Sequence, residues 1–104
     1  IRLKFTIMSI RITCITKAGG DHENPYVAIS RLGWVNLFNP AEKNSSTRQE
    51  MYDFVAKGGE AFVYDRTGTI RSKLICVMSP KGTMYVKTEP DSTKKDNLLG
   101  LGEC

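Results

Sequence analysis

The chain has 104 residues, of which 40% are hydrophobic and 25% are charged. That length suits one domain, and that balance is typical of a globular protein with one modest core, which excludes a disordered chain. Its 15 Lys and Arg residues outnumber 11 Asp and Glu residues, so the net charge is +4. The basic residues are spread along the chain, and charge alone therefore does not indicate nucleic-acid binding. No apolar run approaches the ~20 residues that a membrane-spanning helix needs, so the sequence predicts no such helix.

The cysteines are three in number, at Cys14, Cys76 and Cys104, with no close spacing. An odd, widely spaced set is not typical of a disulfide framework. Cys14 and Cys76 lie in apolar, strand-like runs and are predicted to be small core residues, whereas Cys104 is predicted to be exposed. Three reduced thiols fit the cytosol, so a cytoplasmic location is expected.

The hydrophobic pattern changes phase near the N-terminus. Apolar residues occupy odd positions up to Ile7 and even positions from Met8 to Cys14. Because one face of a strand repeats every second residue, the change indicates a bulge or two separate segments. Met8 is the expected natural start. Residues 1–8 are then a leader, or an extension of the first strand, and residues 9–104 form a single α+β domain.

Two strands are predicted in the first third of the chain. Residues 9–17 are rich in β-branched side chains and predict the first strand. Residues 26–32 predict the second, which Gly33 and Trp34 close. Residues 36–45 predict a polar loop.

One helix is predicted over residues 47–57, ended by a left-handed glycine at Gly58 or Gly59. Two pairs of residues could form the capping box at its start: Ser46 with Gln49, or Thr47 with Glu50. A single apolar stripe lies along it at helical spacing: Met51, Phe54 and Val55.

Three further strands are predicted at residues 61–64, 73–78 and 83–88, joined by tight turns. The run 73–78 is almost continuously apolar and predicts a central strand covered on both faces. The order ββαβββ predicts an α+β fold with one helix packed on a small antiparallel sheet. An ordered C-terminal segment is expected to follow, with its leucines docked on the sheet.

Catalytic and metal chemistry are not expected. His22 is the single histidine, and its neighbours Asp21 and Glu23 would point to opposite sides of an extended chain. A nucleophile such as Cys14 or Cys76 would need His22 as its base, without any local signature. The sequence also has no glycine-rich phosphate loop. We therefore expect no enzyme activity, no cofactor and no metal.

A binding function is more plausible, and the last strand suggests where. Tyr85 and Lys87 should share one face of that strand, with Val86 in the core. Lys87 would supply charge, Tyr85 would stack on a ligand, and Asn97 would form directional hydrogen bonds. The predicted ligand-binding residues are Trp34, Tyr85, Lys87, Thr88, Asp91, Asp96 and Asn97. As alternatives, Trp34 could belong to the core and Asn97 could be a structural cap.

A second set of residues predicts a different ligand. Basic residues gather around the turns of the last hairpins: Arg66, Arg71, Lys73 and Lys81. Basic residues interleaved with aromatic ones can neutralise phosphates and stack bases, so this set predicts nucleic-acid binding as an alternative. A solvated surface with no ligand is the other interpretation.

Several motifs resemble one family. They are Ile12-Thr13-Cys14-Ile15-x-Lys17, His22-Glu23, Gly33-Trp34, Tyr85-Val86-Lys87-Thr88-x-x-Asp91 and Asp96-Asn97-Leu98-Leu99-x-Leu101-x-x-Cys104. Over about residues 9–104 the chain resembles a family of short bacterial proteins catalogued as domain of unknown function 3892. The family usually has proline where this chain has Gly102, and the loop at 36–46 is longer here. The resemblance supports Met8 as the start and implies no activity.

Together these patterns predict a non-catalytic binding module. Its expected ligand is a small anionic or nucleotide-like molecule or a protein partner, in the manner of phage-borne proteins that sequester ligands. The alternatives are a nucleic-acid-binding protein and a small hydrolase or thiol enzyme. A homo-oligomer could complete a pocket that one small chain lacks, and no membrane association is expected.

Overall fold

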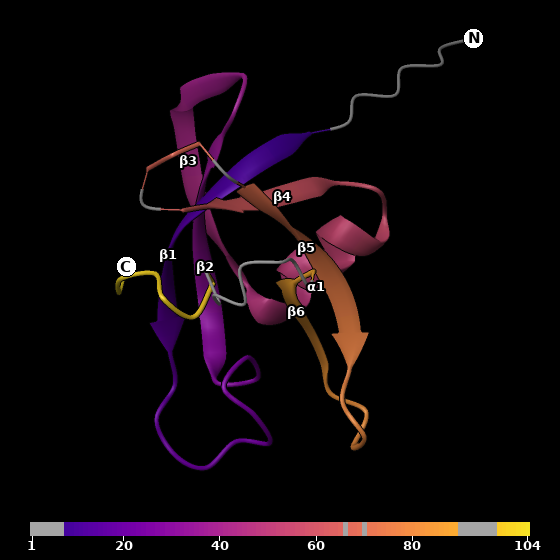
Figure 1. Ribbon diagram of the computed structural model, residues 1–104. Coiled ribbons are helices and arrows are strands. Elements are labelled where there is room, and N and C mark those ends of the chain that lie inside the picture. The colour runs from indigo at the N-terminus through magenta and orange to yellow at the C-terminus, as the bar shows by residue number, and fades with distance from the viewer. Residues whose placement is uncertain (1–7, 66, 70, 90–97) are drawn as a thin grey trace, which may run out of the picture.

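The computed structural model describes residues 8–65, 67–69, 71–89 and 98–104 (Figure 1). They form a six-stranded sheet of order β3-β2-β1-β4-β5-β6 with one helix. The elements are β1 (Ser9–Lys17), β2 (Ile29–Asn36), β3 (Asn39–Thr47), α1 (Arg48–Ala56), β4 (Glu60–Tyr64), β5 (Arg71–Met78) and β6 (Met84–Thr88). The α+β fold is confirmed. The sheet is mixed rather than purely antiparallel, because β1 and β4 pair in parallel.

The order of elements differs from the prediction by one strand, because the predicted polar loop at 36–45 is wrong. Most of that segment is the edge strand β3, whose residues are mostly exposed. An edge strand pairs on one side only and tolerates polar residues and proline, here Pro40, so it lacks a hydrophobic pattern. The turn before it is held by Asn36, whose side-chain oxygen accepts the N–H of Phe38 at 2.8 Å.

Strand β2 begins three residues later than predicted and includes the pair that was expected to close it. The side-chain oxygen of Asn24 accepts the N–H groups of Tyr26 and Val27, at 2.9 and 3.1 Å. This Asx turn keeps the segment out of the sheet until Ile29. Gly33 therefore lies inside the strand rather than after it.

A bulge in β1 determines which way its side chains point. The register with β2 shifts between Ile12 and Cys14, which leaves Thr13 as the extra residue. A bulge inverts the alternation of side chains. Ile12 and Ile15 are accordingly both buried, at 1% and 0% exposure, although they are three residues apart. The change of phase that the sequence indicates at Met8 is a separate feature, because residues 1–7 lie outside the described residues.

This bulge overturns the prediction that Cys14 is a core residue. Cys14 pairs with Gly33 of β2, while Ile15 pairs with Leu32. Adjacent residues of a strand point to opposite faces, so a buried Ile15 turns Cys14 away from the core.

Helix α1 is confirmed close to its predicted limits. Of the two open capping boxes, the structure has Thr47 with Glu50: Glu50 N donates to Thr47 Oγ1 at 3.1 Å, and Thr47 N donates to Glu50 Oε1 at 2.8 Å. Gly58, with φ 102°, ends the helix in the left-handed conformation. Met51 is 1% exposed and anchors α1 to the core. Within the described part of the chain, no helix has the length and apolarity needed to span a membrane.

The sheet bends along β5. The first three residues of β5 pair with β4, and the rest of the strand pairs with β6. β6 thereby comes to lie beside α1 (Figure 1). The prediction that this strand is covered on both faces is wrong, because only Ser72 and Leu74 of β5 are buried and Met78 is 59% exposed. The core consists of Ile10, Ile12, Ile15, Ile29, Leu32, Met51, Ala61, Val63, Leu74, Val86 and Leu98.

The end of the chain closes a gap in the sheet. β4 pairs with β1 only through Arg11, which leaves the edge of β1 open further along. There Ile15 N donates to Gly102 O at 3.0 Å, and Cys104 N donates to Ile15 O at 3.1 Å. Leu98 is fully buried. For residues 98–104 the expected ordered, docked segment is confirmed, and Figure 1 shows it in yellow beside β1.

Candidate functional site

The sheet has two different faces. Helix α1 packs, through Met51, on the face that contains the core residues. On β4, Ala61 and Val63 point into that core, so Phe62 and Tyr64 point to the opposite side, which we call the open face. Residues paired across strands share a face. The open face therefore includes Arg11, Cys14, Gly33, Val35, Lys43, Ser45, Phe62, Tyr64, Arg71 and Lys73.

Two arginines on the open face lie over aromatic rings. The guanidinium carbon of Arg11 is 4.7 Å from the ring centroid of Tyr64, which joins β1 to β4. That of Arg71 is 4.0 Å from the ring centroid of Phe62, which joins β5 to β4. Phe62 is only 7% exposed, although it points away from the core. Each contact contributes about 0.5–1 kcal/mol at an exposed site and holds a flexible side chain in one place.

The arginines of this face have no acidic partner in the part of the chain that the structure describes. Among the described residues, no carboxylate forms a hydrogen bond or ion pair with Arg11 or Arg71. Lys73 pairs with Phe62 in the sheet and adds a third positive charge, and Lys43 on β3 adds a fourth. The N–H groups of two oriented guanidinium groups are thus available to an anion.

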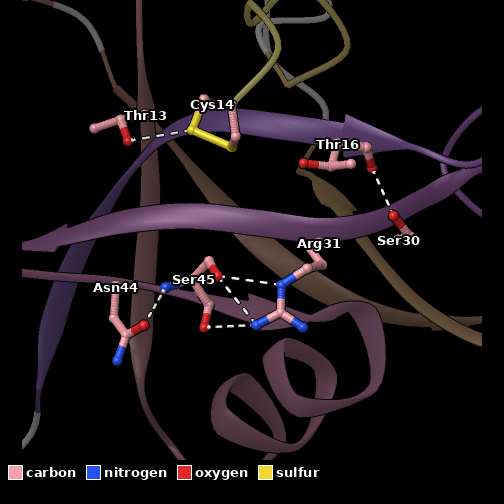
Figure 2. Close-up of a disulfide and its surroundings, with 8 residues drawn as sticks. Thr13, Cys14, Thr16, Ser30, Arg31, Asn44 and Ser45 are labelled. Carbon is pink, nitrogen blue, oxygen red and sulfur yellow. Dashed lines mark hydrogen bonds between the residues drawn. A yellow bond between two sulfur atoms is a disulfide. The ribbon is translucent and has the colours of Figure 1, made fainter.

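Further along the same face, a disulfide joins Cys14 to Cys104, with 4.9 Å between their Cα atoms (Figure 2). The prediction of three reduced cysteines is therefore wrong. The bulge at Thr13 turns Cys14 outward, and the pairing of the C-terminal segment with β1 brings Cys104 next to it. Gly33 makes room for the bond, because a Cβ there would lie 2.5 Å from Cys14 Sγ.

A shallow groove of about 240 Å³ borders the disulfide. It is lined by Thr13, Cys14, Gly33, Trp34, Val35, Lys43, Asn44, Ser45 and Cys104. Beside it, Arg31 donates from Nε and Nη2 to Ser45 Oγ at 3.1 and 3.0 Å (Figure 2). Arg31 therefore links β2 to β3, and Lys43 is the cation that lines the groove.

The predicted ligand-binding residues do not converge in the described part of the chain. Tyr85 is 8% exposed, and its ring stacks on that of Tyr26 with 6.0 Å between the centroids. The ring is therefore not open for the predicted stacking on a ligand. Lys87 and Thr88 are half-buried along β6. Trp34 lies in β2, with β1, β4 and β5 between it and β6 in the sheet.

The alternatives left open for two of these residues have different outcomes. Trp34 packs against the core, and its Nε1 donates to Ser46 Oγ at 3.0 Å, which agrees with a core role. Asp91, Asp96 and Asn97 lie outside the described residues.

The predicted basic residues separate into two groups. Arg71 and Lys73 share the open face at the start of β5. Lys81 lies in the turn that follows β5, beside Glu23. The pKa of Glu23 is lowered first by a hydrogen bond from Thr83, with a smaller contribution from the charge of Lys81. Arg66 lies outside the described residues.

Arg11 was missed in the sequence, although a signal for it exists. It stands between two buried isoleucines, so the alternation of β1 places it on the open face. Phe62 and Tyr64 flank the buried Val63 in the same way. Neither alternation indicates that β1 and β4 are neighbours, because the two strands pair in parallel and the chain between them includes β2, β3 and α1.

The residues considered for catalysis lie apart. His22 is exposed, and its Nε2 lies 3.0 Å from the carbonyl oxygen of Gly19. Cys76 donates from Sγ to the carbonyl oxygen of Tyr52 at 3.3 Å, and burial raises the pKa of its thiol. In the described ranges, no three His, Cys, Asp or Glu residues are grouped as metal ligands.

These features define a small α+β domain with a helix-covered core and a basic, aromatic open face. The chain belongs to the family described as protein of unknown function (DUF3892), whose family model matches residues 11–102. This confirms the resemblance found in the sequence. No curated protein and no solved structure matches the chain.

Proposed function

We propose that the protein is a non-catalytic module that binds single-stranded nucleic acid on its open face. The observation that supports this most is the pair of arginines stacked on aromatic rings without a carboxylate partner among the described residues. A guanidinium group binds phosphate through two parallel N–H groups, and its plane can stack on a base. One side chain held on a ring thus offers both contacts that nucleic acids use.

The extent of the positive charge favours a polymer over a mononucleotide. Lys73 lies on β5 and Lys43 on β3, with β4, β1 and β2 between them. Four strand spacings of about 4.8 Å separate them by about 19 Å, which is longer than a single nucleotide. A strand with several phosphates can contact charges at both ends of this distance.

The shape of the face favours a single strand over a duplex. Direct readout of a duplex commonly places a helix or a β-ribbon in the major groove. Here α1 packs through Met51 on the other side of the sheet, and the arginines lie close to the sheet surface. Sheets with stacking side chains and basic residues are typical of single-strand recognition.

A non-catalytic role is supported by the separation of the reactive groups. Cys76 is hydrogen-bonded to α1, and His22 to its own loop, so neither activates the other. A cytoplasmic location stays part of the proposal because nucleic acid is found there. The expectation of three reduced cysteines no longer supports it. The expected homo-oligomer stays a prediction, which native mass spectrometry can test.

The test is fluorescence anisotropy with labelled single-stranded DNA and RNA, a labelled duplex, and a free nucleotide as competitor. We expect Arg11→Ala and Arg71→Ala each to weaken single-strand binding about tenfold, the loss of roughly one stacking contact. Lys81→Ala is the matched control, because it removes the same charge away from the open face. Arg71→Lys should recover only part of the affinity, since it restores charge without stacking.

Two outcomes would contradict the proposal. If Lys81→Ala weakened binding as much as Arg71→Ala, the open face would not be the site. If a free nucleotide competed as well per molecule as an oligonucleotide, the ligand would be the small anionic molecule that the sequence suggested.

A further inference from the structure

We propose that the Cys14–Cys104 disulfide is an exchange site for small anionic thiols, which bind in the adjoining groove and attach reversibly to Cys104. The exchange would release the end of the chain from β1. This proposal does not depend on nucleic-acid binding.

The disulfide is accessible from one side and supported on the other. Cys104 is exposed, whereas Cys14 is half-buried in β1 and faces Gly33. The groove of about 240 Å³ meets the bond at Cys14 and Cys104 and has room for a small molecule. An incoming thiol therefore reaches the sulfur of Cys104 more readily than that of Cys14.

The lining of the groove favours a negatively charged thiol. Lys43 is exposed on β3 and lines the groove, so its ammonium group can attract a carboxylate or sulfonate. Positive charge near a disulfide also favours the thiolate, which is the attacking form.

The reaction is a thiol–disulfide exchange. The thiolate of the small thiol attacks Cys104 Sγ, a new S–S bond forms there, and the Cys14–Cys104 bond breaks. The electron pair leaves on Cys14 Sγ, which takes a proton from solvent. Thr13 Oγ1 lies 3.9 Å from Cys14 Sγ and donates to it, which stabilises the departing thiolate. A second thiol then attacks the mixed disulfide, giving the small-molecule disulfide and two reduced cysteines.

Opening the bond should loosen only the last residues. Two backbone hydrogen bonds hold them to Ile15, one through Gly102 and one through Cys104. Leu98 is fully buried and anchors the segment from the other end. Exchange at Cys104 therefore frees residues 102–104 and exposes the N–H of Ile15, while the core stays folded.

The test uses the oxidised full chain with two probes, the anionic 2-mercaptoethanesulfonate and the neutral 2-mercaptoethanol. Intact mass and peptide mapping should show one adduct, on Cys104. Lys43→Glu changes the local charge by two units and should slow the anionic thiol about tenfold, roughly threefold for each unit, while leaving the neutral thiol unchanged. Lys57→Glu, the same change at the C-terminal end of α1, should alter neither rate. Hydrogen exchange at Ile15 should accelerate in the adduct and equally in Cys104→Ser.

Each of the other outcomes overturns the proposal. The bond would not be an exchange site if no adduct formed on the folded protein, or if the adduct formed on Cys76. The groove would have no role if Lys43→Glu slowed both thiols equally or neither. The release of the chain end would be wrong if exchange at Ile15 stayed unchanged in the adduct.

Discussion

Gly33 is a residue with little preference for strands, yet it lies in the middle of β2. Its partner across the sheet is Cys14, and a Cβ at Gly33 would lie 2.5 Å from Cys14 Sγ and 3.0 Å from Cys104 Sγ. Glycine at this position therefore leaves room for the disulfide on the open face. The same glycine looked like the end of a strand in the sequence, because nothing there indicates the sulfur atoms above it.

Gly33→Ala should consequently disturb the disulfide. We expect the free energy of unfolding to fall by about 1–3 kcal/mol, the usual cost of forcing an extra methyl group into a packed site. Urea unfolding and a count of free thiols measure the effect. In a Cys104→Ser background the same substitution should cost clearly less. An equal cost in both backgrounds would mean that Gly33 is required for some other reason.

Cys76 behaves differently from the paired cysteines. Burial, and then the charge of Asp53, raise the pKa of its thiol above the ordinary 9.0. The folded state thus holds this proton more tightly than the unfolded chain does. The resulting stability is fully present below pH 9 and is lost as the pH rises through the folded pKa.

The pH profile of alkylation tests this assignment. We expect iodoacetamide to label Cys76 in the folded protein slowly, with a rate that still rises above pH 9.0. Unfolded protein should reach its plateau at a lower pH. A folded-state profile that levelled off at or below pH 9.0 would show that the thiol is not shielded.

At the scale of elements, the C-terminal segment completes the sheet. It pairs with β1 beyond the point where the pairing with β4 ends. The disulfide there links two cysteines that are 90 positions apart in the sequence and so closes a large covalent ring. Cross-linking so long a loop limits the unfolded chain and stabilises the fold by about 2–4 kcal/mol.

Cys104→Ser should therefore lower the free energy of unfolding by about 2–4 kcal/mol, measured by urea denaturation under oxidising conditions. Cys14→Ser should have nearly the same effect, because either change opens the same ring. A reducing agent should destabilise the native sequence and leave both variants unchanged. If it also destabilised the variants, the loss could not be assigned to the bond.

Elements with a strong internal pattern were predictable, and those defined by their neighbours were not. The signals for α1 all lie in one short stretch of sequence: the capping residues, Met51 and Gly58. The polar sequence of β3 becomes a strand only because β2 offers it an edge. The bulge at Thr13 is likewise visible only in the register with β2, and it reversed the orientation of Cys14.

The candidate site was predictable only in part for a related reason. Arg71 and Lys73 were found because they are close in sequence. Arg11 joins them through the parallel pairing of β1 with β4, which no local pattern indicates. Tyr85 was predicted to stack on a ligand, but Tyr26 from a distant loop already stacks on its ring. The pattern within β6 cannot indicate this contact.

At the scale of the whole molecule, the two faces of the sheet have different compositions. One contains the core and α1 and provides stability. The other has oriented arginines, a groove and a disulfide, and of these the disulfide also stabilises the fold. The net charge of +4 is modest, so its local arrangement on the open face matters more than its total.

The salt dependence of binding to a single-stranded oligonucleotide tests this interpretation most directly. The logarithm of the binding constant should fall linearly with the logarithm of salt concentration, with a slope of about −0.7 for each phosphate contacted. With Arg11, Arg71, Lys73 and Lys43 each neutralising one phosphate, the native slope should be about −2.8. Removing both arginines should reduce its magnitude by about 1.4, with Lys81→Ala unchanged. A slope near zero, or one that the double variant shares with the native protein, would contradict binding at the open face.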